Sequence, residues 1–142
     1  MEAQEIIQCR GHPLVSGTHP TTFEVTVESH LTSTGNCIIG IGADKGCAGL
    51  SAEFKTVLAH DDARLLTRLS CGGIDVEIHS RGSSQFTLMH PTDMVWRRST
   101  FVCGRTIGIL SDQVAATLPD DLIKNLIAEK EMTVTLVATR PG

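Results

Sequence analysis

Hydrophobic and polar residues alternate along several short stretches of the chain, which is the pattern of β-strands with one buried face. Residues 22–29 place Phe23, Val25 and Val27 on one face of such a strand and polar side chains on the other. Other runs of strand character, alternating or continuously apolar, are residues 5–10, 37–42, 63–70, 75–80, 85–89, 105–110 and 132–139.

Two segments instead space their apolar residues as an amphipathic helix does. In residues 50–60, Ser51 is the expected N-cap, and Phe54 and Leu58 belong to the buried face. Residues 118–130 begin with a proline and two acids, which suit a helix N-terminus, and continue with a stripe of Leu and Ile. Eight or more strands with two short helices predict a mainly β protein, α+β by content.

The tripeptide His-Pro-Thr occurs twice, at residues 19–21 and 90–92. An offset of 71 brings these together and matches residues 5–26 to residues 76–97 without a gap, with six of 22 positions identical. Chance and shared strand composition are the alternative explanation.

A second gap-free block follows at an offset of 68. Here residues 37–50 match residues 105–118, and the match continues as far as Thr67 over Thr135, as if one loop of the second copy lacked three residues. Two long blocks in the same order favour duplication over chance.

We therefore predict a single domain, residues 1–142, built of two repeats, residues 1–71 and 72–142, each with the order β-β-β-α-β. A half of this size would be marginal alone, and residues 70–75 indicate a turn rather than a linker. The halves should interleave about a pseudo-twofold axis as a sandwich or a closed barrel.

Composition narrows the range of partners and compartments. The 142 residues carry a net charge of −4 and include one Trp, no Tyr and four Phe, which argues against nucleic acid as a partner. The longest apolar runs are too short to span a membrane, and the acidic N-terminus does not resemble a secretory signal. Five cysteines without a Cys-x-x-Cys pair predict free, mostly buried thiols in a reducing cytoplasm.

Four strings together carry a family resemblance: "GTHPTTFEVT", "LTSTGNCIIGIGAD", "MHPTDMVWRRSTFVCGRTIGI" and "SDQVAATL". They resemble an archaeal family of unknown function, number 371 among the domains of unknown function. The resemblance covers almost the whole chain and implies an archaeal cytoplasmic protein with a β-rich, duplicated fold. It implies no activity, so no catalytic residue and no cofactor follow from it.

The repeated His-Pro-Thr suggests two interpretations. Proline extends the residue before it, so His19 and His90 should stand at the entry of strands, with Thr21 and Thr92 closing the turns. A structural turn is the favoured interpretation. The functional alternative is two histidines facing a shared cleft, available for proton transfer.

Asp44 and Asp112 form a second matched pair, each between a buried strand and a helix. An Asx-turn or cap is again the favoured interpretation. The functional alternative is a pair of carboxylates close enough to share a proton.

The turn "GIGADKG" at residues 40–46 lacks the spacing of a dinucleotide or P-loop motif. A glycine-rich turn explains it, but Lys45 and Gly46 have no counterpart in the second copy, so an anion site here would distinguish the halves. We also consider an interface at Trp96, Arg97 and Arg98, because Trp and Arg are enriched at binding hot spots.

The leading hypothesis is a small anionic ligand in a cleft between the halves, with ligand-binding residues drawn from the matched pairs and the glycine turn. These candidates are His19, Thr21, Asp44, Lys45, Gly46, His90, Thr92 and Asp112. The alternatives are an enzyme using His and Asp acid–base chemistry at that cleft, or a protein or RNA interaction module docking through the Trp96 region. The sequence identifies no catalytic or metal-binding residue, and it leaves cofactor, ligand, enzymatic activity and oligomeric state undetermined.

Overall fold

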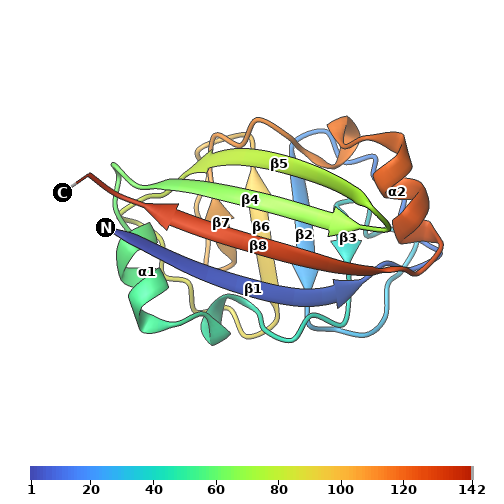
Figure 1. Ribbon diagram of the computed structural model, residues 1–142, viewed down its shortest axis with the longest axis horizontal. Coiled ribbons are helices and arrows are strands. Elements are labelled where there is room, and N and C mark those ends of the chain that lie inside the picture. The colour runs from blue at the N-terminus through green and yellow to red at the C-terminus, as the bar shows by residue number, and fades with distance from the viewer. Residues whose placement is uncertain (142) are drawn as a thin grey trace.

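The computed structural model describes residues 1–141, and the chain forms eight strands and two α-helices in that range (Figure 1). The strands are β1 (Glu2–Arg10), β2 (Thr22–Thr26), β3 (Ile38–Gly40), β4 (Arg64–Cys71), β5 (Ile74–Arg81), β6 (Asp93–Arg97), β7 (Thr106–Gly108) and β8 (Glu131–Thr139). The helices are α1 (Ala52–Leu58) and α2 (Asp120–Ile127). Neither helix is long and apolar enough to cross a membrane.

The first sheet is antiparallel throughout, with the strand order β1-β8-β4-β5. Its strands alternate strictly between buried and exposed positions, so one face supplies apolar side chains to the core and the other faces solvent. Gly72 and Gly73 connect β4 to β5 with positive φ angles of 59° and 83°, which a two-residue hairpin of this kind requires. The turn expected at residues 70–75 is therefore present.

The second sheet has the order β3-β2-β6-β7. Its two central strands, β2 and β6, are antiparallel, and each outer strand runs parallel to its central neighbour. Phe23 and Trp96 face each other across β2 and β6, and their rings stack with centroids 4.5 Å apart. This pair lies on the core side of the sheet, and the Trp96 indole donates to Thr67 Oγ1 of the first sheet at 2.9 Å.

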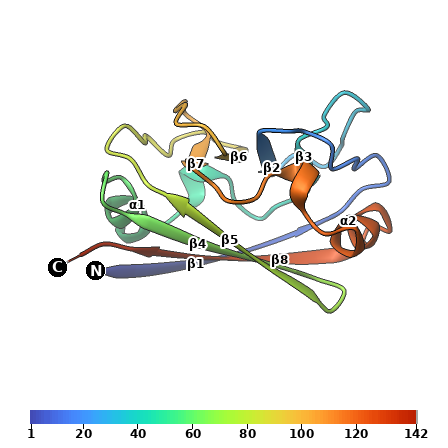
Figure 2. The same cartoon turned by 90° about the horizontal axis from the view of Figure 1, so that it is seen from above.

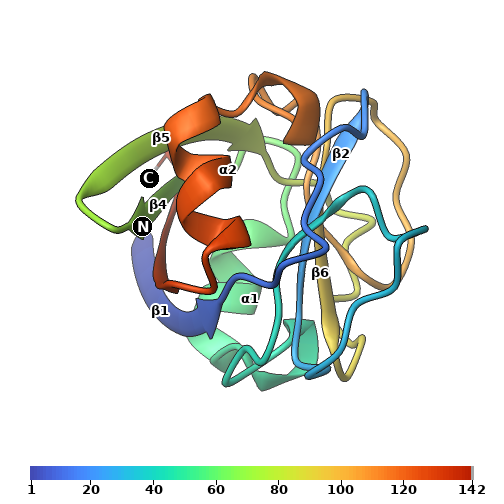
Figure 3. The ribbon, with the colours of Figure 1, turned by 90° about the vertical axis from the view of Figure 1, so that its right-hand side faces the viewer.

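The two sheets face each other as layers, with the apolar core between them (Figure 2). Seen from one end, α2 lies between the layers (Figure 3), and α1 lies at the opposite end of the molecule. Of the two expected arrangements, the sandwich describes the structure: within residues 1–141 the strands form two four-stranded sheets rather than one closed sheet. Single bridges, Arg10 to Ile41 and Arg81 to Ile109, connect the sheets at their corners.

The helix boundaries follow from local signals in the sequence. Ser51 Oγ accepts from the Phe54 N–H at 3.1 Å, as expected of an N-cap. At the second helix, Pro119 takes the N-cap position and Asp120 and Asp121 occupy the first turn, where acids are favourable.

Residues 1–71 and 72–139 have the same order of elements, β-β-β-α-β. The connection between the second and third strands is residues 27–37 in the first half and residues 98–105 in the second, which is three residues shorter. One expected element is wrong: residues 85–89 form no strand, because Leu88 has a φ of 51° that interrupts the extended backbone.

The match of Thr67 to Thr135 is also wrong. Thr67 points into the core, whereas Thr135 lies on the outer, partly exposed face of β8. The buried residues correspond at an offset of 67, which places Thr67 over Val134. A slip of one residue exchanges the two faces of a strand, so the sequence identity was misleading here.

The Trp96 interface requires a correction as well. Trp96 is 0% exposed, since it stacks on Phe23 within the core. A fully buried indole offers no surface to a partner, so docking through this residue is excluded in the folded chain. Arg98 is exposed, and Arg97 stands over the Phe101 ring at 4.9 Å.

Candidate functional site

The glycine turn is held by contacts within the chain. Lys45 Nζ lies 3.0 Å from Glu5 Oε1, and the other oxygen of that carboxylate accepts from the Ser51 N–H. Gly42 has a φ of 61° and lies against the Arg10 guanidinium. Gly46 packs against the backbone of Thr92, so this turn reaches the second His-Pro-Thr segment. Lys45 is thus neutralised by Glu5, and its role as an anion ligand stays a prediction.

Asp44 and Asp112 each hold the backbone of a neighbouring strand. Asp44 Oδ1 accepts from the Gln8 N–H at 3.2 Å, and Asp112 Oδ1 accepts from the His79 N–H at 2.9 Å. Their partners lie on β1 and β5, the two edges of the first sheet, which are three strand spacings or about 14 Å apart. The structure therefore separates the two carboxylates, and their contacts are those of the favoured turn interpretation.

The two histidines cap their strands in the same way. His19 Nδ1 accepts from the Thr22 N–H at 3.1 Å, and His90 Nδ1 accepts from the Asp93 N–H at 2.9 Å. Each ring nitrogen also accepts, at 3.3 Å, from the N–H of the threonine in its own triplet, Thr21 or Thr92. The expected strand-entry turns are present at both sites.

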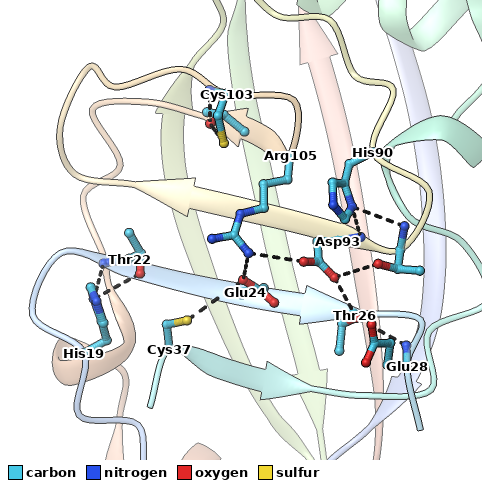
Figure 4. A network of polar contacts seen from close by, with 12 residues as sticks. His19, Thr22, Glu24, Thr26, Glu28, Cys37, His90, Asp93, Cys103 and Arg105 are labelled. Atoms are coloured by element: carbon cyan, nitrogen blue, oxygen red, sulfur yellow. Dashed lines mark hydrogen bonds and ion pairs between the residues drawn. The ribbon is translucent and has the colours of Figure 1, made fainter. Parts of the chain in front are cut away.

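The histidines lie at opposite ends of the β2–β6 pair. Thr22, next to His19, is opposite Arg97, whereas Asp93, next to His90, is opposite Thr26 four residues along β2. Figure 4 shows the two rings well apart, on either side of a group of polar side chains around Arg105. His90 contacts the backbone of this network at Asp93, whereas the contacts of His19 to Thr21 and Thr22 are separate from it.

At the centre of the network, two carboxylates share one guanidinium nitrogen. Arg105 Nη1 lies 3.2 Å from Glu24 Oε1 on β2 and 3.2 Å from Asp93 Oδ2 on β6 (Figure 4). The carboxylates come from different halves of the chain, and Arg105 comes from the loop before β7. We refer to Glu24, Asp93 and Arg105 as the acid–arginine cluster.

The two carboxylates have unequal surroundings. Asp93 Oδ1 accepts from the hydroxyls of Thr26 at 2.8 Å and Thr92 at 2.9 Å. Glu24 Oε1 has, besides Arg105, only a weak thiol donor, Cys37 Sγ at 3.9 Å. Glu24 is also the more buried, with 5% of its side chain exposed against 15% for Asp93.

These surroundings shift the pKa values of the two carboxyl groups in opposite directions. Burial raises the pKa of Glu24 to about 7, the Asp93 carboxylate adds to the rise, and Arg105 opposes it. Burial alone would raise the pKa of Asp93 too, but hydrogen bonds from Thr26, Thr92 and Arg105 outweigh it and lower that pKa. Near neutral pH, Asp93 is ionised while Glu24 exchanges its proton.

Glu24 Oε2 is open to solvent even though the residue is buried. It has no hydrogen-bond partner among residues 1–141, and in that range every fully buried side-chain oxygen or nitrogen has one. The side chain of Arg105 is 42% exposed beside it. A proton from solvent can therefore reach Glu24 beside the exposed Arg105 side chain.

A second cation and a thiol flank the cluster. Arg97 donates to Thr106 Oγ1 at 2.9 Å and to Cys103 Sγ at 3.2 Å. Burial of Cys103 opposes ionisation of its thiol. Hydrogen bonds from the Arg105 backbone, Thr106 and Arg97 outweigh burial and lower the pKa of Cys103 to about 7. In contrast, burial raises the pKa of Cys9 and of Cys47 to about 12.

The acid–arginine cluster was not among the sequence-predicted sites, because its residues are neither matched between the halves nor close together in the chain. At the offsets of the repeat, Glu24 corresponds to Val95, and Arg105 corresponds to Cys37. The signal that could have found the site was the replacement of an apolar residue by an acid within one matched strand. No group of three or more His, Cys, Asp or Glu side chains between residues 1 and 141 is arranged to hold a metal ion.

Comparison with known proteins agrees with the resemblance of the motifs. The chain matches the family described as a domain of unknown function (DUF371) over residues 7–139. It is 39% identical over 132 residues to an uncharacterized protein of Methanocaldococcus jannaschii, covering 93% of this chain and 97% of that protein. The chain therefore belongs to the DUF371 family, whose function is unknown.

Proposed function

We propose that the protein binds a small anionic ligand at the acid–arginine cluster and couples this binding to the proton on Glu24. One observation carries the proposal: two carboxylates from different halves share a guanidinium nitrogen, yet their surroundings separate their pKa values. Such separated pairs identify proton carriers in acid–base sites. Here Asp93 is the fixed anion and Glu24 the proton carrier.

Arg105 supplies the ligand contact. A guanidinium has five N–H donors, and the two carboxylates engage only its Nη1. The remaining donors of this 42% exposed side chain suit the two oxygens of a carboxylate. A neutral Glu24 does not repel such an anion, whereas an ionised Glu24 does. Binding should therefore weaken as the pH rises through about 7.

This site differs from the one expected from sequence alone. It keeps the small anionic ligand between the halves, but Glu24, Asp93 and Arg105 replace the histidines and Lys45 as its chemical groups. The enzyme alternative relied on His and Asp, and in this proposal the proton carrier is Glu24 instead.

Pyruvate is a suitable probe, and the broadening of its own methyl signal in NMR spectra reports its binding to the unaltered protein and to every variant. We expect the affinity for pyruvate at pH 6 to be about tenfold higher than at pH 8, because the ionised Glu24 carboxylate repels the anionic ligand. Glu24→Gln should bind with no pH dependence, and Arg105→Gln should lose binding. Arg98→Gln, on the same loop, is the control and should bind as the unaltered protein does. Equal binding at both pH values, or binding that persists in Arg105→Gln, would refute the proposal.

Two structural expectations are also retained as proposals. The common order of elements and the symmetric strand orders support a duplicated single domain of residues 1–71 and 72–142. The five free cysteines support a reducing compartment such as the cytoplasm.

A further inference from the structure

A cleft of about 460 Å³ lies on the outer side of the first sheet, away from the acid–arginine cluster. Both halves of the chain line it, since Arg64 comes from β4 and Arg81 from β5. His79, Leu66 and Leu110 line it as well. The cleft thus combines two guanidinium groups with apolar side chains.

Arg64 and Arg81 are directly opposite each other on neighbouring antiparallel strands. Both are exposed, and their side chains make no hydrogen bond or ion pair with another residue in the range 1–141. Like charges in this position destabilise a sheet. Further along the same strands, Arg68 instead faces Glu77 in an ion pair of 2.8 Å. The Arg64–Arg81 pair therefore has a cost that an anion between the two groups would remove.

The opposite corner of the same sheet provides an internal comparison. There Arg10, the counterpart of Arg81, stands opposite Glu131. When β4 is aligned with β8 by their buried positions, at an offset of 67, Arg64 corresponds to Glu131. The cavity at that first corner is smaller, about 260 Å³.

The backbone is alike at the two corners. Gly42 at one corner and Leu110 at the other both have positive φ, 61° and 52°, although Leu is disfavoured there. Asp44 and Asp112 make the same backbone contact at each. The corners differ in side chains: one pairs an arginine with an acid, and the other pairs two arginines and adds an exposed leucine.

We propose that the Arg64–Arg81 cleft binds the phosphate group of a small phosphomonoester whose apolar part packs against Leu66 and Leu110. Two guanidinium forks match the oxygens and double charge of a phosphate better than the single charge of a carboxylate. Glu2 and Asp112 also line the cleft, but neither forms an ion pair with an arginine among residues 1–141. This site is independent of the proposed function because it lies on the other sheet.

Thermal unfolding with phenyl phosphate tests the proposal, since a ligand of the folded state raises the melting temperature by mass action. The unaltered protein should show a saturable rise. Arg64→Gln and Arg81→Gln should each weaken the apparent affinity at least fivefold. Both variants should fold, because each removes one member of a like-charge pair. Arg10→Gln at the matched corner should respond as the unaltered protein does, and Glu2→Gln should bind more tightly.

Three controls separate the proposal from its competitors. Potassium chloride at equal ionic strength should not reproduce the shift. Inorganic phosphate should bind more weakly than phenyl phosphate, and equal affinity would refute the apolar contact. Glu24→Gln should leave the response intact, so failure of one site does not imply failure of the other. Equal responses from Arg64→Gln and Arg10→Gln would overturn the phosphate site.

Discussion

The first and second halves of the chain differ in an instructive way. Where they agree, the side chains hold backbone: His19 and His90 cap strands, and Asp44 and Asp112 bind strand N–H groups. The charged residues of the acid–arginine cluster lie instead at positions where the halves differ. Glu24, for example, stands where the second half has Val95.

The residues that the two halves share thus report on backbone geometry. A turn must be closed in both copies, so the same residue serves twice. The residues that differ between the halves build the charged clusters instead. Glu24, which stands where the second half has Val95, meets Arg105, and Arg64 stands where the other corner has Glu131.

The largest expected effect concerns the matched pair Gly11 and Gly82. A Cβ at Gly11 would overlap the Leu126 carbonyl of α2, and a Cβ at Gly82 would overlap the Leu58 carbonyl of α1. Each glycine thus allows one half to approach the helix of the other half. We expect Gly11→Ala and Gly82→Ala each to lower the free energy of unfolding by about 3 kcal/mol in urea denaturation.

Gly104→Ala is the control for this measurement, because its nearest neighbour, Thr87 Oγ1, is at an ordinary contact distance of 3.9 Å. It should change the free energy of unfolding by less than about 0.5 kcal/mol. A large loss in only one of Gly11→Ala and Gly82→Ala would show that the halves are not equivalent as frameworks.

The next prediction concerns Glu24, a residue at which the two halves differ. The pKa of Glu24 is raised from 4.5 to about 7 on folding. The neutral side chain therefore contributes stability that is complete below pH 4.5 and is lost as the pH rises through 7. Glu24→Gln removes this dependence. Between pH 4.5 and pH 8 the unaltered protein should lose about 3 kcal/mol relative to the variant, measured by urea unfolding.

The lowered pKa of Asp93 has the opposite sign, because its contribution is present above pH 3.8 and is lost as the pH falls. Above pH 4.5 the Cys103 thiol, with its pKa of about 7, also titrates, so the difference between the unaltered protein and Glu24→Gln is what isolates Glu24. Parallel stability curves for the unaltered protein and Glu24→Gln would contradict the unequal surroundings of the two acids.

The smallest effect concerns the histidine caps. His19→Ala and His90→Ala each remove an acceptor for backbone N–H groups at the start of a strand. Each should lower the free energy of unfolding by about 1 kcal/mol in urea denaturation, and by similar amounts because the contacts match. A loss of several kcal/mol at one site alone would indicate a role beyond capping.

Most strands, the helix starts and the β4–β5 turn could be predicted from the sequence. Alternating and continuously apolar runs predicted most strands, the Ser51 cap and the acidic first turn of α2 indicated the helices, and the glycines indicated the β4–β5 hairpin. These signals suffice because each depends on neighbours in the chain. Where local backbone geometry departed from the pattern, as at Leu88, the expected strand at residues 85–89 was wrong.

Which side chains meet depends on how the sheets pair and pack in the whole fold. Glu24 lies 81 residues from Arg105, and pairing of β2 with β6 brings Asp93 to the same guanidinium. Trp96 looked like a surface anchor until stacking on Phe23 placed it in the core. Alternation indicates that a strand has two faces, but burial of each face depends on what packs against it. That packing is a property of the whole fold, which is why the acid–arginine cluster could not be predicted from the sequence alone.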